Sequence, residues 1–342
     1  MPFRRPVRVA VVGATGAVGR EFARLLEERE WPVDELSLFA SKRSVGKRQP
    51  FKGDEVLVRE CCSGGFKGVD IAFFSAGAEV SKTYAPCALE SGAIVIDNSS
   101  AFRMRSDVPL VIPEINASEI SATTRLIANP NCTAIILLMA IAPLRSLGKF
   151  ERVVMTSYQS ASGAGAAAMK ELEEQSRAVL EGREAEPSVF PHQCAFNVFS
   201  HDSPIGETGM NVEEEKVIEE TRKILGMPDL KVNATCVRVP VFRAHSVSVL
   251  VEFSGEAPGI DAARSAIADF SGVRLVDDRE KNHFPMPVEA SGQNDVLVGR
   301  IRQDPSSRNG LCLFASGDQL LKGAALNAVQ IAECAPIVEA LS

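Results

Sequence analysis

One cysteine of the sequence stands where a helix is expected to begin. The β-rich apolar run that includes Leu126 stops at Pro130, and the apolar stretch 134–142, which has helical length, starts just after Cys132. Cys132 is therefore predicted in the first turn of a buried helix, where unpaired backbone N–H groups and the helix dipole favour a thiolate. In such a position the pKa of a thiol can fall from about 8.5 to roughly 3.5–7.5. Cys132 is a candidate nucleophile, against the other interpretation of a small buried core residue.

A nucleophilic thiol needs a proton-transfer partner, and His245 is the candidate. It is one of four histidines and lies seven residues after Arg238, with Pro240 expected to bend the chain between them. A lone histidine at the start of a strand is usually structural. A candidate thiolate in the same chain reverses that balance, because a nearby base activates a nucleophile.

A glycine-rich turn follows the first predicted strand. The apolar run Val7–Val12 ends in a turn from Gly13 to Gly19, and apolar residues then repeat at helical spacing. Strand, glycine turn and helix are typical of a dinucleotide site, where backbone N–H groups approach a pyrophosphate at the helix N-terminus. The spacing is G-x-x-G-x-x-G rather than G-x-G-x-x-G, so the evidence comes from the position of the turn at the start of a β-α series more than from the motif.

The end of the second predicted strand, Leu36–Ala40, lacks the acidic residue that NAD-specific folds place on the adenosine ribose. A basic segment with Arg43 and Ser44 follows instead. Arginine and serine can hold a 2′-phosphate through charge-assisted hydrogen bonds, whereas a carboxylate would repel it. The sequence therefore favours NADP over NAD, with a solvated basic loop as the other interpretation.

The pattern of elements predicts two domains in this 342-residue chain. In residues 1–131, short apolar runs alternate with helices, which predicts an N-terminal Rossmann-like, NADP-binding α/β domain with a parallel sheet. Two of its strands, Val69–Phe74 and Ala93–Ile96, end in small polar residues at the edge where ligands bind. Arg103, beyond the second of them, is a candidate anion clamp or a solvated loop arginine.

In residues 132–318 strands follow one another with fewer helices, which predicts an α+β catalytic and dimerisation domain with a mainly antiparallel sheet. Residues 181–210 are rich in Pro and Gly without periodicity and suggest a functional loop. A final helix from about residue 319 is expected to be buried against the first domain, to which 319–342 is assigned. The strands are predicted at Phe150–Gln159, Lys231–Val239, His245–Phe253, Val273–Val276, Val296–Gln303 and Leu311–Ser316.

Composition narrows the class of protein. A net charge of -7 argues against a nucleic-acid or anionic-membrane partner, and no apolar run approaches the roughly 18 residues of a membrane span. The eight cysteines show neither C-x-x-C pairs nor zinc-type spacing, so no metal is expected and the thiols are interpreted as reduced. Together with the absence of a signal-type N-terminus, this predicts a cytoplasmic protein.

Seven motifs, in order and nearly from end to end, resemble those of the aspartate-semialdehyde dehydrogenase family. Any one could arise by chance, but the set in this order could hardly do so. They are Gly13 to Gly19, Asp97 to Met104, Asn129 to Thr133, Tyr158 to Gly163, Glu213 to Lys216, Cys236 to Pro240 with Ala244 to Ser246, and Gly323 to Asn327.

The resemblance implies NADPH-dependent reductive dephosphorylation of L-aspartyl-4-phosphate to L-aspartate-4-semialdehyde by a homodimer, in the biosynthesis of lysine and diaminopimelate, threonine, methionine and isoleucine. It implies that Cys132 forms an acyl-thioester, that His245 is the general acid/base and that Gln159 orients the substrate. Arg238 would hold the substrate α-carboxylate and Glu213 its amino group. Arg103, Asn131 and Lys216 correspond to the phosphate site. The NADP contacts would be Gly13, Thr15, Gly16, Ala17, Val18, Arg43, Ser44, Ser162, Gly163 and Gln319.

Two other functions remain open from the residues. One is the related reductase that acts on N-acetyl-glutamyl phosphate, although Arg238 and the Glu213/Lys216 pair suit a free amino acid better. The other is a catalytically inactive relative with a binding or regulatory role, which would be expected to have lost Cys132. Glu213 and Lys216, three apart on a predicted helix, are by themselves as well explained by an exposed ion pair.

Overall fold

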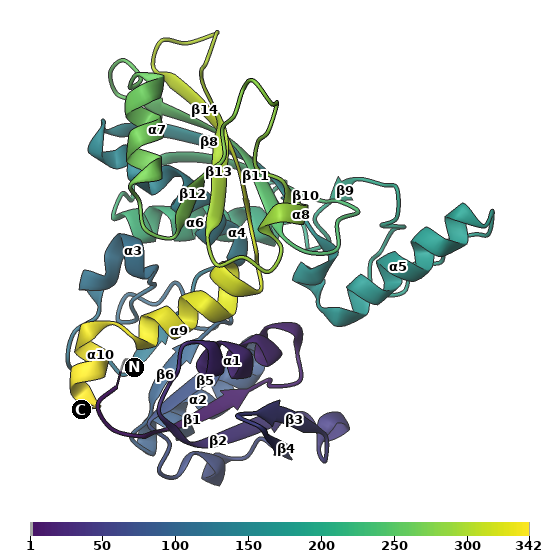
Figure 1. Cartoon of the computed structure of the whole chain (residues 1–342), viewed down its shortest axis with the longest axis vertical. Helices are drawn as coiled ribbons and strands as arrows, with labels where there is room; N and C mark the ends of the chain where they lie inside the picture. Colours follow the sequence, from purple (N-terminus) through teal and green to yellow (C-terminus); the bar gives the residue numbers. More distant parts are fainter. Residues whose placement is uncertain (1–2, 342) are drawn as a thin grey trace. The chain divides into compact units, whose positions relative to one another are not determined.

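The computed structural model describes residues 3–341, which divide into two compact units (Figure 1). One unit contains the residues up to Asn131 together with those from Ala324 on, and the other is Cys132–Gly323. Residues 319–323, expected in the first domain, belong to the second unit. Residues 1, 2 and 342, which the predicted domain ranges include, lie outside the described part of the chain.

The first unit is built on a seven-stranded sheet of the Rossmann-like type that the sequence predicts. Its pairs are parallel except for a hairpin at one edge. The sequence does not predict that hairpin, β3 with β4, because the basic segment that follows Ala40 is typical of a loop. The strand order is β3 (Arg48–Phe51), β4 (Asp54–Glu60), β2 (Val33–Ala40), β1 (Val7–Val12), β5 (Ile71–Phe74), β6 (Ile94–Asp97) and β7 (Leu126–Ala128).

Three helices pack against this sheet. Helix α1 (Ala17–Glu28) follows the glycine turn and contacts α9 (Leu326–Ala332), which also contacts β6. Helix α2 (Ala78–Glu90) links β5 to β6. The β5–α2–β6 connection moves along the sheet in the opposite direction from the β1–α1–β2 connection. Because such connections are right-handed, α2 lies on the face of the sheet opposite α1.

The C-terminal segment is not the single helix that the sequence predicts. It begins with a π-helical turn, Leu321–Ala325, continues as α9 and resumes after a break as α10 (Ala335–Ala340). Pro336 explains the break, because a proline lacks the N–H of the helical ladder and its ring clashes with the carbonyl four residues earlier. Asn327 of α9 donates to the carbonyl oxygen of Val111 and to Oδ1 of Asn129, at 3.0 and 2.7 Å.

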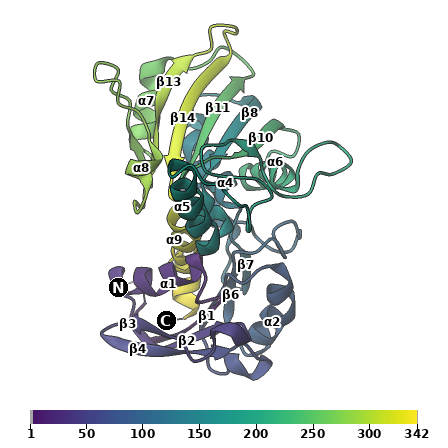
Figure 2. The ribbon, with the colours of Figure 1, turned by 90° about the vertical axis from the view of Figure 1, so that its right-hand side faces the viewer.

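The second unit contains another seven-stranded sheet, mainly antiparallel as predicted. The parallel exceptions are β8 with β10 and β12 with β13. Helices α4 (Cys132–Ile141), α6 (Val212–Leu225) and α7 (Ile260–Ala268) cover one face of this sheet (Figure 2). The strand order is β12 (Val273–Leu275), β13 (Val296–Gln303), β14 (Gly310–Gly317), β11 (His245–Phe253), β8 (Phe150–Gln159), β10 (Lys231–Arg238) and β9 (Phe199–Ser200).

The other face of the second sheet carries a band of half-exposed side chains. Along β8, β11 and β14 the alternate residues are less buried than their neighbours, and the rings of Tyr158 and Phe314 lie 6.1 Å apart. We call this band the open face; it consists of Val154, Thr156, Tyr158, Ser248, Leu250, Cys312 and Phe314.

Helix α5 (Ala166–Leu180) projects from the second unit, away from its sheet (Figure 1). The segment 181–210 that follows is irregular as predicted, with β9 its single strand among the described residues. None of the helices in residues 3–341 combines the length and apolar character that a membrane crossing demands.

Candidate active site

Cys132 is the first residue of α4, as predicted. The other residues of this helix are buried, whereas Cys132 is half-buried at its N-terminal end. Gly323 lies against it, since a Cβ at position 323 would stand 3.1 Å from the Cβ of Cys132. A nearly uniformly apolar helix fixed in the core therefore holds one thiol at its positive end.

Three predicted site residues lie at the ends of neighbouring strands. Gln159 ends β8, Arg238 ends β10 and His245 begins β11. In the parallel pairing of β10 with β8, Arg238 stands opposite Gln159, and β11 pairs with the other side of β8. All three side chains are buried. Sheet register thus brings together residues that are up to 86 positions apart in the sequence.

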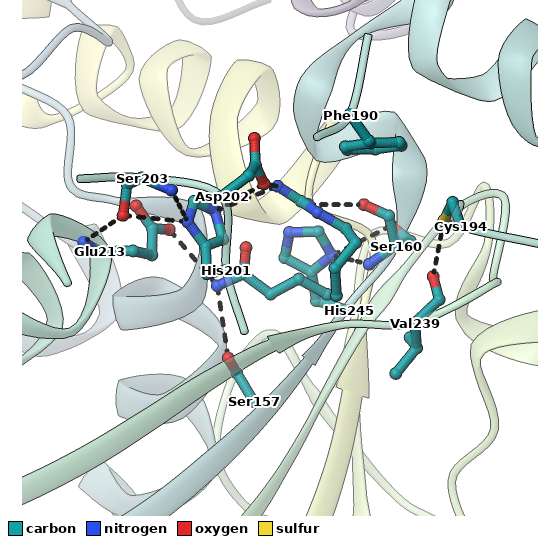
Figure 3. Close-up of polar contacts among 12 residues, drawn as sticks. Ser157, Ser160, Phe190, Cys194, His201, Asp202, Ser203, Glu213, Val239 and His245 are labelled. Atoms are coloured by element: carbon teal, nitrogen blue, oxygen red, sulfur yellow. Dashed lines mark hydrogen bonds and ion pairs between the residues drawn. The ribbon is translucent and has the colours of Figure 1, made fainter. Parts of the chain in front are cut away.

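His245 is held by Ser160, which the sequence analysis did not single out (Figure 3). The Ser160 backbone N–H donates to His245 Nδ1 at 3.0 Å, and the Ser160 hydroxyl lies 3.0 Å from the same nitrogen. A backbone N–H can only donate, so Nδ1 accepts and the neutral ring carries its proton on Nε2. That Nε2 is buried and has no partner among the described residues.

The environment of His245 favours the neutral ring. The side chain is 0% exposed, and burial lowers its pKa well below 6.5, with the charge of Arg238 acting in the same direction. An unpartnered buried donor is costly for a fold and is typical of a site where a ligand completes the hydrogen bond.

Three residues that the resemblance assigns to NADP lie beside this histidine. A Cβ at Gly163 would stand 3.1 Å from His245 Nε2 and 3.3 Å from Arg238 Nη1. Gln319 donates to the hydroxyl of Ser162 and accepts from the backbone N–H of residue 244 at 2.9 Å. Residue 244, an alanine, has a φ of 72°, a conformation that non-glycine residues rarely adopt. Gln319 therefore supports the turn that leads into His245.

Arg238 is surrounded by partners that sequence reasoning missed. Its Nη1 donates to the carbonyl oxygen of Ser160 at 3.1 Å, and its Nη2 to Asp202 Oδ1 at 2.7 Å and to His201 Nε2 at 3.1 Å. The ring of Phe190 lies 5.1 Å from the guanidinium carbon. Three of these partners belong to segment 181–210, whose lack of periodicity was the only sequence signal of a special role.

Glu213 and Lys216, which the resemblance assigns to the substrate, lie in the first turns of α6. The helix is fixed by a capping box, in which Asn211 accepts from the Glu214 backbone N–H and Glu214 from that of Asn211. Glu213 is buried, 3.4 Å from Gln159 Nε2 and 3.7 Å from Lys216 Nζ. The alternative of an exposed helical ion pair is therefore wrong.

Helix α5 anchors the irregular segment. Glu171 accepts hydrogen bonds from the backbone N–H groups of 188–190 and from the Ser188 hydroxyl. Gln175 Oε1 accepts from the backbone N–H groups of Cys194 and Ala195, at 2.8 and 3.1 Å. Two side chains one helical turn apart thus fix the stretch that carries Phe190 against Arg238.

In the first unit, the close approach of backbone atoms requires glycine at two positions of the turn. A Cβ at Gly13, whose φ is 90°, would lie 2.4 Å from the carbonyl oxygen of Ser75, and one at Gly19 would lie 2.1 Å from that of Gly13. Gly16 is the N-cap of α1, which begins at Ala17 and continues through Val18. The hydroxyls of Thr15 and Ser44 are 3.2 Å apart, and Arg43 is exposed.

Arg103 is not the solvated loop arginine that was the other interpretation. It is buried, and it donates to the carbonyl oxygens of Asn129 and Asn98 at 3.0 and 2.7 Å. Asn131, also buried, directly precedes Cys132 in the chain.

Two models of known protein families match this chain. The model of the semialdehyde dehydrogenase NAD binding domain matches residues 8–123, and that of the semialdehyde dehydrogenase dimerisation domain matches residues 141–322. With the two sheets described above, these matches define an oxidoreductase of the semialdehyde dehydrogenase type that has a nicotinamide-dinucleotide-binding domain.

Individual relatives narrow the family. The chain is 52% identical to aspartate-semialdehyde dehydrogenase of Synechocystis sp., covering 96% of this chain and 97% of that protein, and 46% identical to that of Bacillus subtilis, with 96% and 97% covered. The crystal structure of Vibrio cholerae aspartate semialdehyde dehydrogenase II complexed with ASA matches with a TM-score of 0.92 at 42% identity, covering 96% of this chain and 98% of that one. The chain belongs to the aspartate-semialdehyde dehydrogenase family.

Proposed function

We propose that this protein reduces L-aspartyl-4-phosphate to L-aspartate-4-semialdehyde, with release of phosphate, in the biosynthesis of lysine and diaminopimelate, threonine, methionine and isoleucine. The observation that carries the proposal is the buried, unpartnered Nε2 of His245 beside the buried guanidinium of Arg238. The half-buried thiol of Cys132 in the same unit supplies the nucleophile. The names of the relatives support the choice of substrate.

Cys132 and His245 divide the chemistry. The Cys132 thiolate attacks the acyl carbon, the phosphate leaves and a thioester remains. A thiol suits this role because it is both a good nucleophile and a good leaving group. His245 donates its Nε2 proton to the substrate oxygen as the thioester is reduced to a thiohemiacetal. It takes a proton back from that oxygen while the carbon–sulfur bond breaks and the aldehyde leaves, and such proton transfer contributes roughly 10²–10⁴-fold.

The amino-acid end of the substrate is anionic at one group and cationic at the other. A guanidinium can hold a carboxylate through two parallel hydrogen bonds, so Arg238 is assigned to the α-carboxylate. Glu213 is assigned to the α-ammonium and Gln159, 3.4 Å from it, to the orientation of the acyl group. Lys216, Arg103 and Asn131 are assigned to the phosphate.

We assign NADP as the cofactor. The glycine turn fits a pyrophosphate, because Gly16, the N-cap of α1, places no side chain at the N-terminus of that helix. Arg43, with Ser44 tied to Thr15, is assigned to the 2′-phosphate. When bound, NADPH supplies the hydride for the reduction. Ser162, Gly163 and Gln319 are assigned to the nicotinamide half of the cofactor.

A homodimer through the second domain is part of the proposal. The open face presents apolar and small polar side chains on three central strands, and such a surface is typical of a protein interface. The matched dimerisation-domain model supports this assignment. We further assign the protein to the cytoplasm, where these biosynthetic substrates and reduced thiols occur.

The test is phosphate-dependent reduction of NADP by the purified protein given aspartate semialdehyde, with NAD in parallel and Cys132→Ala as the matched variant. We expect phosphate-dependent activity that is stronger with NADP and absent from the variant. Activity with an N-acetylated glutamate semialdehyde instead would transfer the assignment to the related reductase. NADP binding without activity on either substrate would indicate an inactive relative.

A further inference from the structure

The hydrogen-bond donors of Arg238 are already largely engaged. A guanidinium offers two edges for a bidentate carboxylate, Nε with Nη2 and Nη1 with Nη2, so Nη2 belongs to both. Its two hydrogens go to Asp202 Oδ1 at 2.7 Å and to His201 Nε2 at 3.1 Å. Among the described residues the buried Nε has no partner. A new carboxylate can therefore find a free Nε–H but no free bidentate edge.

The contact with His201 is a neutral hydrogen bond, and the contact with Asp202 is ionic. An arginine can only donate, so His201 Nε2 accepts and its neutral ring carries the proton on Nδ1, 3.1 Å from the hydroxyl of Ser203. Burial lowers the pKa of His201, which keeps the ring neutral. Asp202 is thus the only one of these partners that supplies Arg238 with a negative charge.

We propose that Asp202 is an internal competitor of the substrate carboxylate, which occupies Arg238 in the free protein and leaves Nη2 when substrate binds. The inference rests on the proposed function, in which Arg238 holds the substrate α-carboxylate. A buried guanidinium needs an anionic partner in both states. Asp202 provides it before binding and the substrate provides it afterwards.

The placement of Asp202 suits this exchange. Its side chain is 25% exposed, against 3% for Arg238, so it can move into water while the arginine stays fixed. It belongs to the irregular segment 181–210 and not to the sheet that holds Arg238. The next residue, Ser203, accepts from the backbone N–H of Glu213 at 3.2 Å. Release of Asp202 therefore acts on a turn that contacts the start of α6.

The exchange also determines substrate selection. A substrate with an α-carboxylate replaces one anion by another, so the buried guanidinium remains paired. An aldehyde without that carboxylate has nothing to displace Asp202. Competition from Asp202 thus lowers the affinity of every ligand that forms fewer than two hydrogen bonds with Arg238.

Asp202→Asn tests the proposal, because asparagine keeps the shape and an acceptor oxygen but removes the charge. In the full-length protein we expect the KM for aspartate semialdehyde to fall about three- to tenfold, with kcat within about twofold, since an ion pair of this exposure is worth about one decade or less. Asp229→Asn, at an exposed position of the same unit, is the matched control and should leave both constants unchanged. An unchanged or raised KM in Asp202→Asn would overturn the competitor role.

A binding measurement separates this inference from the proposed reaction. L-Aspartate carries the same α-carboxylate and needs no turnover, so its effect on Tm reports binding at Arg238 directly. We expect a larger Tm increase in Asp202→Asn than in the wild type, and none in Arg238→Lys. Failure of the semialdehyde assay with this pattern intact would count against the reaction alone. Equal Tm shifts in wild type and Asp202→Asn, or no shift in either, would reject the competitor.

Discussion

The backbone N–H of Ser160 donates to Nδ1 of His245 across 3.0 Å, and this one bond determines which ring nitrogen faces the reaction. Because Nδ1 accepts, the proton of the neutral ring lies on Nε2, which is buried and has no partner in residues 3–341. The residue after the last position of β8 thereby sets the tautomer of the residue that begins β11.

The stability of the folded chain should depend on pH through two histidines, His245 and His201. Burial lowers the pKa of His245 well below 6.5, and burial also lowers the pKa of His201. In the unfolded chain both rings gain protons as the pH falls through about 6.5, while in the folded chain they stay neutral to lower pH. The two neutral rings therefore stabilise the folded chain fully above about pH 6.5. This stabilisation is lost as the pH falls from 6.5 toward the lower pKa that each ring has in the folded chain.

Chemical unfolding between pH 8 and 5 measures this loss. His245→Asn should flatten the pH dependence of the free energy of unfolding, and His192→Asn, at an exposed histidine, should not. The kcat/KM profile of the wild type should show no inflection from His245 at 6.5, but only at lower pH. An inflection of kcat/KM at 6.5 that disappears in His245→Asn would contradict the burial argument.

Arg238→Lys should damage substrate binding and leave the fold intact. A lysine keeps the charge but cannot form two parallel hydrogen bonds, so we expect the KM for aspartate semialdehyde to rise about tenfold or more. Circular dichroism and Tm report on the fold. A KM like that of the wild type would remove Arg238 from the carboxylate site.

Gly163→Ala should lower activity through its added methyl group. The new Cβ would stand 3.0 Å from His245 Cε1 and 3.1 Å from Nε2, so it would occupy the space beside the reactive nitrogen. We expect kcat to fall about tenfold or more, with stability reduced by about 1–3 kcal/mol. Gly255→Ala, where a Cβ meets nothing within 4 Å, is the control. Equal kcat in the two variants would show that the space beside Nε2 is not used.

Glu171→Gln should loosen the segment that holds Phe190 against Arg238. Burial raises the pKa of Glu171, but hydrogen bonds from Ser188 and the backbone of 189 and 190 outweigh it and lower the pKa below its usual value. The carboxylate therefore contributes stability near neutral pH that is lost as the pH falls through the lowered pKa.

Removal of that charge is expected to cost about 1–3 kcal/mol of unfolding free energy and to speed proteolysis within 181–210. Glu174→Gln changes an exposed residue of the same helix and is the control. If proteolysis of the segment were equal in the two variants, Glu171 would not be its anchor. Circular dichroism separates loosening of the segment from loss of the whole fold.

Local sequence pattern determined most of the elements. The predicted bounds of β8, β11 and β13 agree with the structure, because apolar periodicity, glycine and proline act within a few residues of one another. The same reasoning located Cys132 at the start of α4. It failed at the β3–β4 hairpin, where exposed charged residues obscure the apolar pattern of the strands. It also failed at the C-terminal helix, which is interrupted before Pro336.

Only the tertiary structure decided how the site is assembled. Ser160 and His245 are 85 residues apart and Arg238 and Asp202 are 36 apart, and no periodicity links either pair. Their contacts follow from the register of β8 with β10 and β11 and from the path of an irregular segment anchored by Glu171. The sequence could identify the reactive side chains by type, but the tautomer of His245 and the counter-ion of Arg238 depend on distances that the folded chain alone creates.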